Sequence, residues 1–224
     1  MAALCIGDAQ RIAVLRKVER HLIYNGAGCV FEINCNGAAH TARHLVHQAA
    51  GFAKKDVFRI LADLGYLFGK KVLREVDEAA FYENLPAVRK KTGDRAVLRA
   101  IHFFGECRRA KALCAAVRED RFEDFLNIVI EGGHSSFEYN QNAYSTKCPA
   151  RQGVPVGLAL SQRVLEGRGA WRLQGGGFAG TIQAFVPYDL LAQYKSVLEG
   201  VFGEGACYVL NIRNYGGVHV HENM

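Results

Sequence analysis

Long apolar runs are missing from this 224-residue chain: no stretch approaches the roughly 18 apolar residues that a transmembrane helix needs. A secretory signal is missing as well, because the apolar start Met1–Ile6 is soon followed by Asp8 and Arg11. The seven cysteines include no C-x-x-C pair, and their number is odd. These absences argue against a membrane protein or a disulfide framework and predict a reduced cytoplasmic protein whose thiols are mostly buried.

A clustered basic stripe is also missing. The net charge is +6, but the basic residues occur as scattered pairs and one triple, Arg89–Lys91, with acidic residues between them. Nucleic-acid binding needs basic residues gathered on one surface, so we expect no nucleic-acid partner. With 50% hydrophobic and 22% charged residues the composition is that of a globular protein, and a mildly basic chain suits phosphorylated small molecules.

The most distinctive feature present is a glycine loop. It consists of Gly175, Gly176, Gly177, Phe178, Ala179 and Gly180, followed by Thr181. Glycine accepts positive φ and lets another group approach the main chain closely. The loop therefore either makes a tight turn that packs Phe178 into the core, or lines an anion site with its N–H groups. The two interpretations are compatible.

Hydrophobic periodicity predicts an α+β fold, a helical bundle followed by a small antiparallel sheet. The expected strands are Cys29–Ile33, Ala170–Leu173, Thr181–Val186 and Cys207–Ile212. The expected helices are Gln10–Leu22, Thr41–Phe52, Asp56–Leu67, a short one from Pro86, Ala96–Arg118, Arg121–Gly132, Val154–Leu165 and Asp189–Leu198. The segment Gly133–Ser136 is expected to be the turn that ends the Arg121–Gly132 helix, and residues 140–142 a loop.

This element order, with the glycine loop between two strands, resembles the C-terminal half of galactokinases in the GHMP kinase superfamily, over about Lys70–Gly217. The helix carrying Glu106, Arg108 and Arg109 is similar to the helix that opens that half. The resemblance implies a ferredoxin-like β-β-α-β portion, a helical N-terminal segment of uncertain identity at 1–69 and a GHMP kinase C-terminal-like domain at 70–224. It also implies ATP-dependent phosphorylation of galactose or a related sugar, with ATP and Mg²⁺. Residues Gly175–Thr181 would then lie at the sugar and phosphate site, and Arg172 and Thr181 flank it.

The departures from that family limit the prediction. The phosphate loop G-L-S-S-S-A and the G-x-M-D-Q segment with the catalytic base do not occur, and Ala42 follows Gly37–Thr41 where the family has aspartate. No catalytic residue is therefore assigned. We expect a truncated or divergent sugar kinase with little activity alone.

Two other interpretations stay open. The chain could be a non-catalytic sugar-binding or regulatory protein derived from the kinase fold. It could also pair with a complementing N-terminal domain or self-associate through an apolar helix face, formed by Ile12, Leu15, Val18 and Leu22.

Four further groups of residues are expected to have no catalytic or metal-binding role. His40, His44 and His47 share one helix face near Cys29 and Cys35, but the gap from Cys35 to His40 is too short for a zinc finger, so no zinc is expected. His134, Ser135 and Ser136 form a small polar cluster, but no further residue at a recognisable spacing completes a catalytic triad with the histidine and a serine. Arg108 and Arg109 are expected to be solvated or paired with Glu106 or Asp120, and Cys107 and Cys114 to lie in the core.

Overall fold

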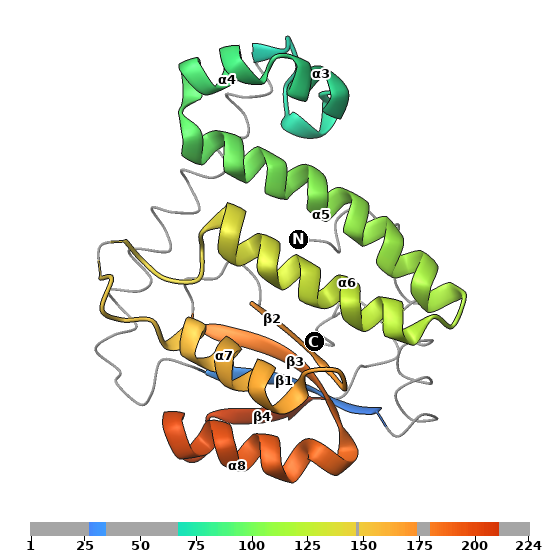
Figure 1. Cartoon of the computed structure of the whole chain (residues 1–224), viewed down its shortest axis with the longest axis vertical. Helices are drawn as coiled ribbons and strands as arrows, with labels where there is room; N and C mark the ends of the chain where they lie inside the picture. The colour runs from blue at the N-terminus through green and yellow to red at the C-terminus, as the bar shows by residue number, and fades with distance from the viewer. Residues whose placement is uncertain (1–26, 35–66, 147, 174–179, 211–224) are drawn as a thin grey trace, which may run out of the picture.

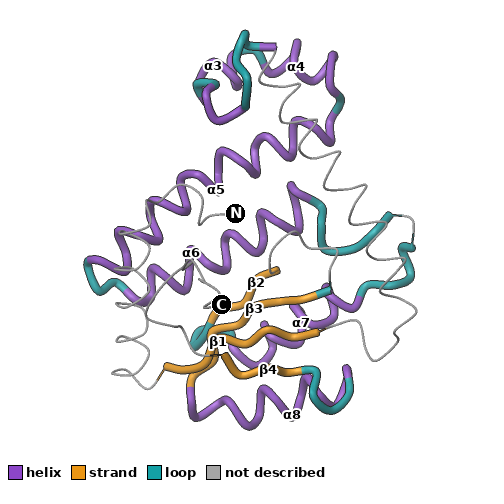
Figure 2. Tube along the Cα trace, turned by 180° about the vertical axis from the view of Figure 1, so that it is seen from behind, coloured by secondary structure: helices purple, strands orange, loops and turns teal. Residues whose placement is uncertain are grey.

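The computed structural model describes residues 27–34, 67–146, 148–173 and 180–210. These residues form an α+β fold in which a four-stranded sheet lies between two pairs of helices (Figure 1). Helices α5 (Asp94–Arg118) and α6 (Phe122–Ser135) lie on one side of the sheet. Helices α7 (Gly153–Leu165) and α8 (Leu191–Phe202) lie on the other (Figure 2). The predicted fold class is confirmed.

The sheet is antiparallel and has the strand order β2-β3-β1-β4. Its strands are β1 (Ala27–Asn34), β2 (Ala170–Leu173), β3 (Thr181–Pro187) and β4 (Cys207–Leu210). All four coincide with strands expected from the sequence. Because β1 pairs with both β3 and β4, a strand from before the expected domain boundary at 69/70 lies inside the sheet. That boundary stays a prediction.

Short helices precede and link the long ones. A 3-10 turn, η2 (Leu73–Glu75), leads to α3 (Glu78–Glu83), whose first turn is capped by the side chain of Asp77. Helix α4 (Leu85–Thr92) has Pro86 in its first turn, as the sequence predicts. A second 3-10 turn, η4 (Tyr188–Leu190), opens α8, so the helix expected from Asp189 begins as a tighter turn.

Alternation along β2 divides its side chains between two cores. Trp171 and Leu173 join the cluster with α7 and α8, in which Tyr194 is fully buried. Ala170 packs on the opposite face with Phe125 of α6. Arg172 shares that second face because side chains two apart on a strand point the same way. Its guanidinium therefore faces α6 and α5 instead of solvent.

The turn expected at Gly133–Ser136 is wrong. Helix α6 runs through these residues to Ser135, and a π-helical segment, η3 (Ser136–Asn140), continues it to Gln141, which has φ 54°. Helix α6 lies so close to β2 at Gly133 that a side chain has little room: a Cβ there would lie 3.1 Å from the carbonyl oxygen of Trp171. The small size of this residue serves helix–strand contact and not chain reversal.

Several expectations lie outside the described residues. These are the helices Gln10–Leu22, Thr41–Phe52 and almost all of Asp56–Leu67, the apolar face proposed for self-association, and the histidines at 40, 44 and 47. Among the residues that the structure does describe, no helix is long and apolar enough to cross a membrane.

Candidate functional site

One face of α5 carries ionisable side chains, although a helix face that packs against other elements is usually apolar. Arg99, His102, Glu106 and Arg109 recur at steps of three and four residues, which places them on one side of the helix. That side meets α6, η3 and β2. Arg99 is buried and its Nε donates to the carbonyl oxygen of Asn140 at 3.4 Å. The polar seam continues along α5 to a cluster around Glu106.

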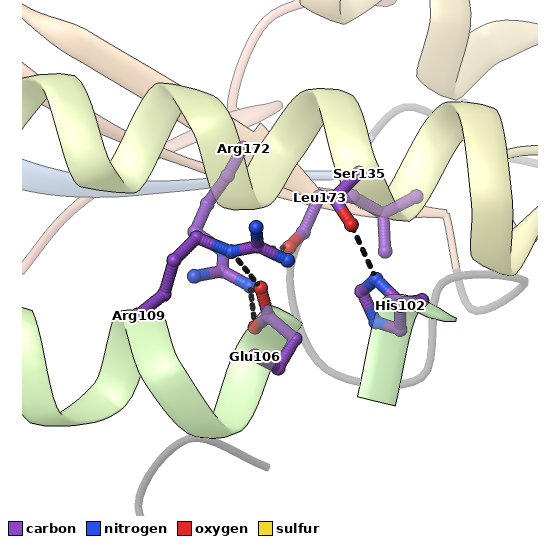
Figure 3. Close-up of polar contacts among 6 residues, drawn as sticks. All are labelled: His102, Glu106, Arg109, Ser135, Arg172 and Leu173. Carbon is purple, nitrogen blue, oxygen red and sulfur yellow. Dashed lines mark hydrogen bonds and ion pairs between the residues drawn. The ribbon is translucent and has the colours of Figure 1, made fainter. Parts of the chain in front are cut away.

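Glu106 is the centre of a partly buried Arg–Glu–Arg triad (Figure 3). Arg109 Nε donates to its Oε1 at 2.6 Å, and Arg172 Nη2 donates to its Oε2 at 3.2 Å. The side chains are 14% exposed for Glu106 and 18% for each arginine. The triad therefore joins α5 to β2 across 66 residues of sequence. Arg109 pairs with Glu106, which is one of the outcomes expected for it. Arg108 is exposed, as expected, and pairs with Glu78.

Two glycines lie against the triad, because its guanidinium groups occupy the space that a side chain at these positions would need. A Cβ at Gly105 would lie 2.9 Å from Arg109 Nη2. A Cβ at Gly132 would lie 3.1 Å from Arg172 Nη1 and 3.2 Å from Glu106 Oε1. Substituted residues at these positions would have to displace charged groups that are already hydrogen-bonded. The glycines in α5 and α6 are thus part of the site.

The triad keeps Glu106 ionised. Burial by itself would raise the pKa of its carboxyl group, but Arg172, Arg109 and His102 together lower it below its ordinary value. Two guanidinium groups face a single carboxylate, and the buried Arg109 Nη2 has no hydrogen-bond partner among the described residues. The triad is therefore positively charged overall, and Glu106 supplies its carboxylate.

His102 lies one helical turn from Glu106 and contacts α6. Its Nδ1 lies 2.9 Å from Ser135 Oγ, a hydrogen bond between partly buried groups. Burial is the main cause that lowers the pKa of His102 to about 4, and the two arginines lower it further. The imidazole is neutral near pH 7. Within the His134–Ser136 segment, Ser135 is buried and His134 is exposed.

We expect the folded protein to lose stability on acidification through His102. Its folded pKa of about 4 lies below the ordinary value of 6.5, so the unfolded chain binds the proton more tightly. The contribution is full above about pH 6.5 and declines towards pH 4, by about 2–3 kcal/mol in total. Urea denaturation at about pH 7 and about pH 4.5 measures this loss.

The matched variant is His102→Gln, which removes the titration and keeps a polar side chain. The change in unfolding free energy between the two pH values should be smaller in the variant than in the wild type. Groups that do not interact with His102 titrate alike in both proteins, whereas Glu106 loses the contribution of His102 to its lowered pKa. Equal pH dependence in the two proteins would contradict the assignment to His102.

The ends of the glycine loop lie next to the triad. Leu173, the residue after Arg172, pairs with Ile182 as the last rung of the β2–β3 ladder. Gly180 is buried and has φ 84°, which glycine accepts without strain, and Thr181 pairs with Asn34 of β1. Gly175–Ala179 lie outside the described residues, so their role at a sugar and phosphate site stays a prediction.

The sequence interpretation overlooked His102 and the Glu106–Arg172 link. Polar residues at 99, 102, 106 and 109 follow the spacing of a packed helix seam, and the small residues of α6 lie opposite. That pairing of a polar seam with glycines is the signal that could have indicated the cluster. Cys114 is buried and burial raises the pKa of its thiol, in line with its expected place in the core. No group of three or more metal-binding side chains occurs in the described part of the chain.

Comparison with known proteins supports one relationship. Over 112 residues, 50% of this chain, the sequence is 34% identical to galactokinase from Bos taurus. This chain is related to the galactokinases. The fold agrees: the structure of Lactococcus lactis galactokinase complexed with galactose matches 82% of the chain with a TM-score of 0.60 at 15% identity. No protein-family profile matches the chain.

The relationship to galactokinase, a GHMP kinase, is partial in length. The matched region covers 26% of the bovine galactokinase, and the structural match covers 45% of the Lactococcus galactokinase. This chain therefore spans less than half of the galactokinases that it matches. At 15% identity the structural match shows the fold alone.

Proposed function

We propose that this chain provides the C-terminal part of a galactokinase-like sugar kinase, which phosphorylates a hydroxyl group of galactose or a related sugar with ATP and Mg²⁺. The observation that carries the proposal is the 34% identity to a galactokinase over half the chain. The glycine loop between β2 and β3 supports it, because such a loop can offer backbone N–H groups to a phosphorylated ligand. The proposed place of action is the cytoplasm, and the proposed partners are the sugar and the nucleotide.

Phosphoryl transfer depends on positioning and charge stabilisation. In our proposal the Gly175–Gly180 loop supplies N–H donors and room for the ligand, and Thr181 supplies a hydroxyl group at its edge. Bound Mg²⁺ would neutralise charge on the transferred phosphate. The described side chains offer no cluster of metal ligands, and Glu106 is engaged by two arginines, so we assign no residue of this chain to Mg²⁺.

We expect the purified chain to release little or no ADP from ATP in the presence of galactose, because the nucleotide loop and catalytic base of the family are missing from its sequence. An ADP-release assay measures this directly. The matched arm mixes the chain with a separately produced N-terminal half of a related galactokinase, which carries those motifs. Turnover that requires both parts supports the proposal, whereas robust turnover by the chain alone contradicts the assignment of the missing parts.

The absence of the G-L-S-S-S-A run also favours a second candidate, a non-catalytic sugar-binding protein. Calorimetry with galactose distinguishes the two in combination with the mixing assay. Binding without turnover in the mixture supports a binding protein. Absence of both contradicts a sugar-directed function.

A further inference from the structure

The two edges of the sheet are covered to different degrees. β2 forms one edge, and its side chains are mostly buried, with α6 on one face of the strand and α7 on the other. β4 forms the other edge, beside α8, and among the described strands it pairs with β1 only (Figure 1). Cys207 at its start is buried, but Tyr208, Val209 and Leu210 are 56%, 49% and 40% exposed. The β4 edge is therefore open, whereas the β2 edge is closed.

The outer side of β4 has main-chain groups that nothing in the described part of the chain takes up. In an edge strand, the N–H and C=O groups of alternate residues point away from the sheet. The other groups of β4 face β1, over a register that runs from Leu210 opposite Val30 to Cys207 opposite Ile33. Outside this ladder, no backbone hydrogen bond between described residues reaches 207–210. A further extended strand can therefore pair with β4.

β4 also lacks the features by which proteins keep edge strands from pairing with one another. Such edges usually carry a charged residue, a proline or a β-bulge. The segment Cys207–Leu210 has no charged residue and no proline, and its register with β1 contains no shift. Its exposed side chains are instead apolar or aromatic, and side chains of this kind stabilise pairs across neighbouring strands. The strand is thus suited to pair with another uncharged strand.

A second copy of β4 meets this requirement. Identical strands pair antiparallel about a two-fold axis perpendicular to the sheet, so residues that lie opposite each other have side chains on the same face. When Val209 lies opposite Val209 of the second copy, Tyr208 lies opposite Leu210, and all three exposed side chains gain an apolar partner. No like charges meet in this register, although the whole chain has a net charge of +6.

Helix α8 adds to the same surface. It packs against β4, and a two-fold axis perpendicular to the sheet places the α8 helices of both copies on the same face. Val201 in the last turn of α8 is exposed and apolar. Because β4 has only four residues, the joined edges form a small interface. A small interface indicates a reversible dimer, with a dissociation constant on the order of 10 µM.

We propose that this chain forms a symmetric dimer through the β4 edge, in which the sheets of two copies join into one continuous sheet. The partner is a second copy of the chain, and the contact consists of main-chain hydrogen bonds and apolar side chains. The dimer does not depend on the proposed kinase function. It also uses a different surface from the N-terminal apolar face that contains Ile12 and Leu15.

The test is analytical ultracentrifugation of the full chain between about 1 and about 200 µM. We expect the wild type to change from monomer to dimer over this range. Val209→Lys should raise the dissociation constant at least roughly tenfold, because each lysine would lie opposite its own copy. Val156→Lys is the matched control: Val156 is also an exposed valine but lies in α7, so the dimer should persist.

Two results of this experiment would overturn the proposal. One is a wild type that stays monomeric at about 200 µM, well above the expected dissociation constant. The other is a Val209→Lys variant that dimerises as strongly as the wild type, because the dimer would then use another surface.

Amide hydrogen exchange on the wild type covers the case in which Val209→Lys does not fold. Exchange of the outward-facing amides in 207–210 should be roughly fivefold slower at about 200 µM than at about 2 µM protein. Exchange in β2, at the opposite edge of the sheet, should not depend on concentration. Exchange over 207–210 that is equal at both concentrations would overturn the proposal.

Discussion

Replacing Glu106 by alanine is expected to lower the free energy of unfolding by about 3–5 kcal/mol. The substitution leaves Arg109 and Arg172 close together and partly buried, with no carboxylate between them, and Arg109 Nη2 already lacks a partner in the described part of the chain. Breaking a buried ion pair from one side costs far more than the pair contributes, because an uncompensated charge remains in a poorly solvated place. Urea denaturation near pH 7 measures the loss.

Glu119→Ala is the matched control for this experiment. Glu119 pairs with Arg121, but its side chain is 59% exposed, so its loss should cost less than about 1 kcal/mol. Similar losses in the two variants would mean that the triad is solvated in the folded protein. A triple variant, Glu106→Leu with Arg109→Met and Arg172→Met, removes all three charges together and should retain most of the stability of the protein.

Replacing Gly169 by alanine is expected to destabilise the fold by about 2–4 kcal/mol. The new Cβ would lie 2.4 Å from the carbonyl oxygen of Phe185 and 3.3 Å from Leu165 Cδ2. Phe185 pairs with Ala170 in the β2–β3 ladder, so relief requires a shift of main chain within the sheet. Thermal and chemical denaturation both report the change.

Gly200→Ala provides the opposite control. Gly200 lies in α8, and a Cβ added there would have no atom of the described residues within 4 Å, so alanine should stabilise the protein by about 0.5–1 kcal/mol. A destabilising effect at Gly200, or a neutral effect at Gly169, would contradict the packing described for these segments.

Most elements could be predicted because their signals are local. The periodic apolar residues of α6, Phe122, Phe125 and Val129, pack in one cluster as expected. The long helix α5 is also confirmed. The face expected to be apolar is only part of its buried surface, because α5 contacts α3 and α4 as well as α6. Periodicity shows that a helix has a buried face but does not show how many neighbours it has.

The candidate site was predicted only in part. The glycine loop and the Glu106–Arg109 pair are short-range features, and the sequence shows both. The link from Glu106 to Arg172 joins residues on separate elements, and no pattern in the chain specifies their distance. The turn expected at Gly133 is wrong for the same reason: glycine is a helix breaker locally, but here it allows α6 to approach β2.

By itself, the sequence determined the α+β class and the positions of the strands and most of the helices in the described part of the chain. It also indicated the relationship to galactokinases. These features could be predicted because helix periodicity, strand alternation and a glycine-rich loop are properties of neighbouring residues. Only the tertiary structure decided that β1 lies between β3 and β4, and that Arg172 reaches Glu106 next to the ends of the glycine loop. Those contacts depend on how α5, α6 and the sheet pack together. In that packing, the cost of burying charged groups is offset by close contact between the elements at the glycines. No single segment of the chain specifies this arrangement.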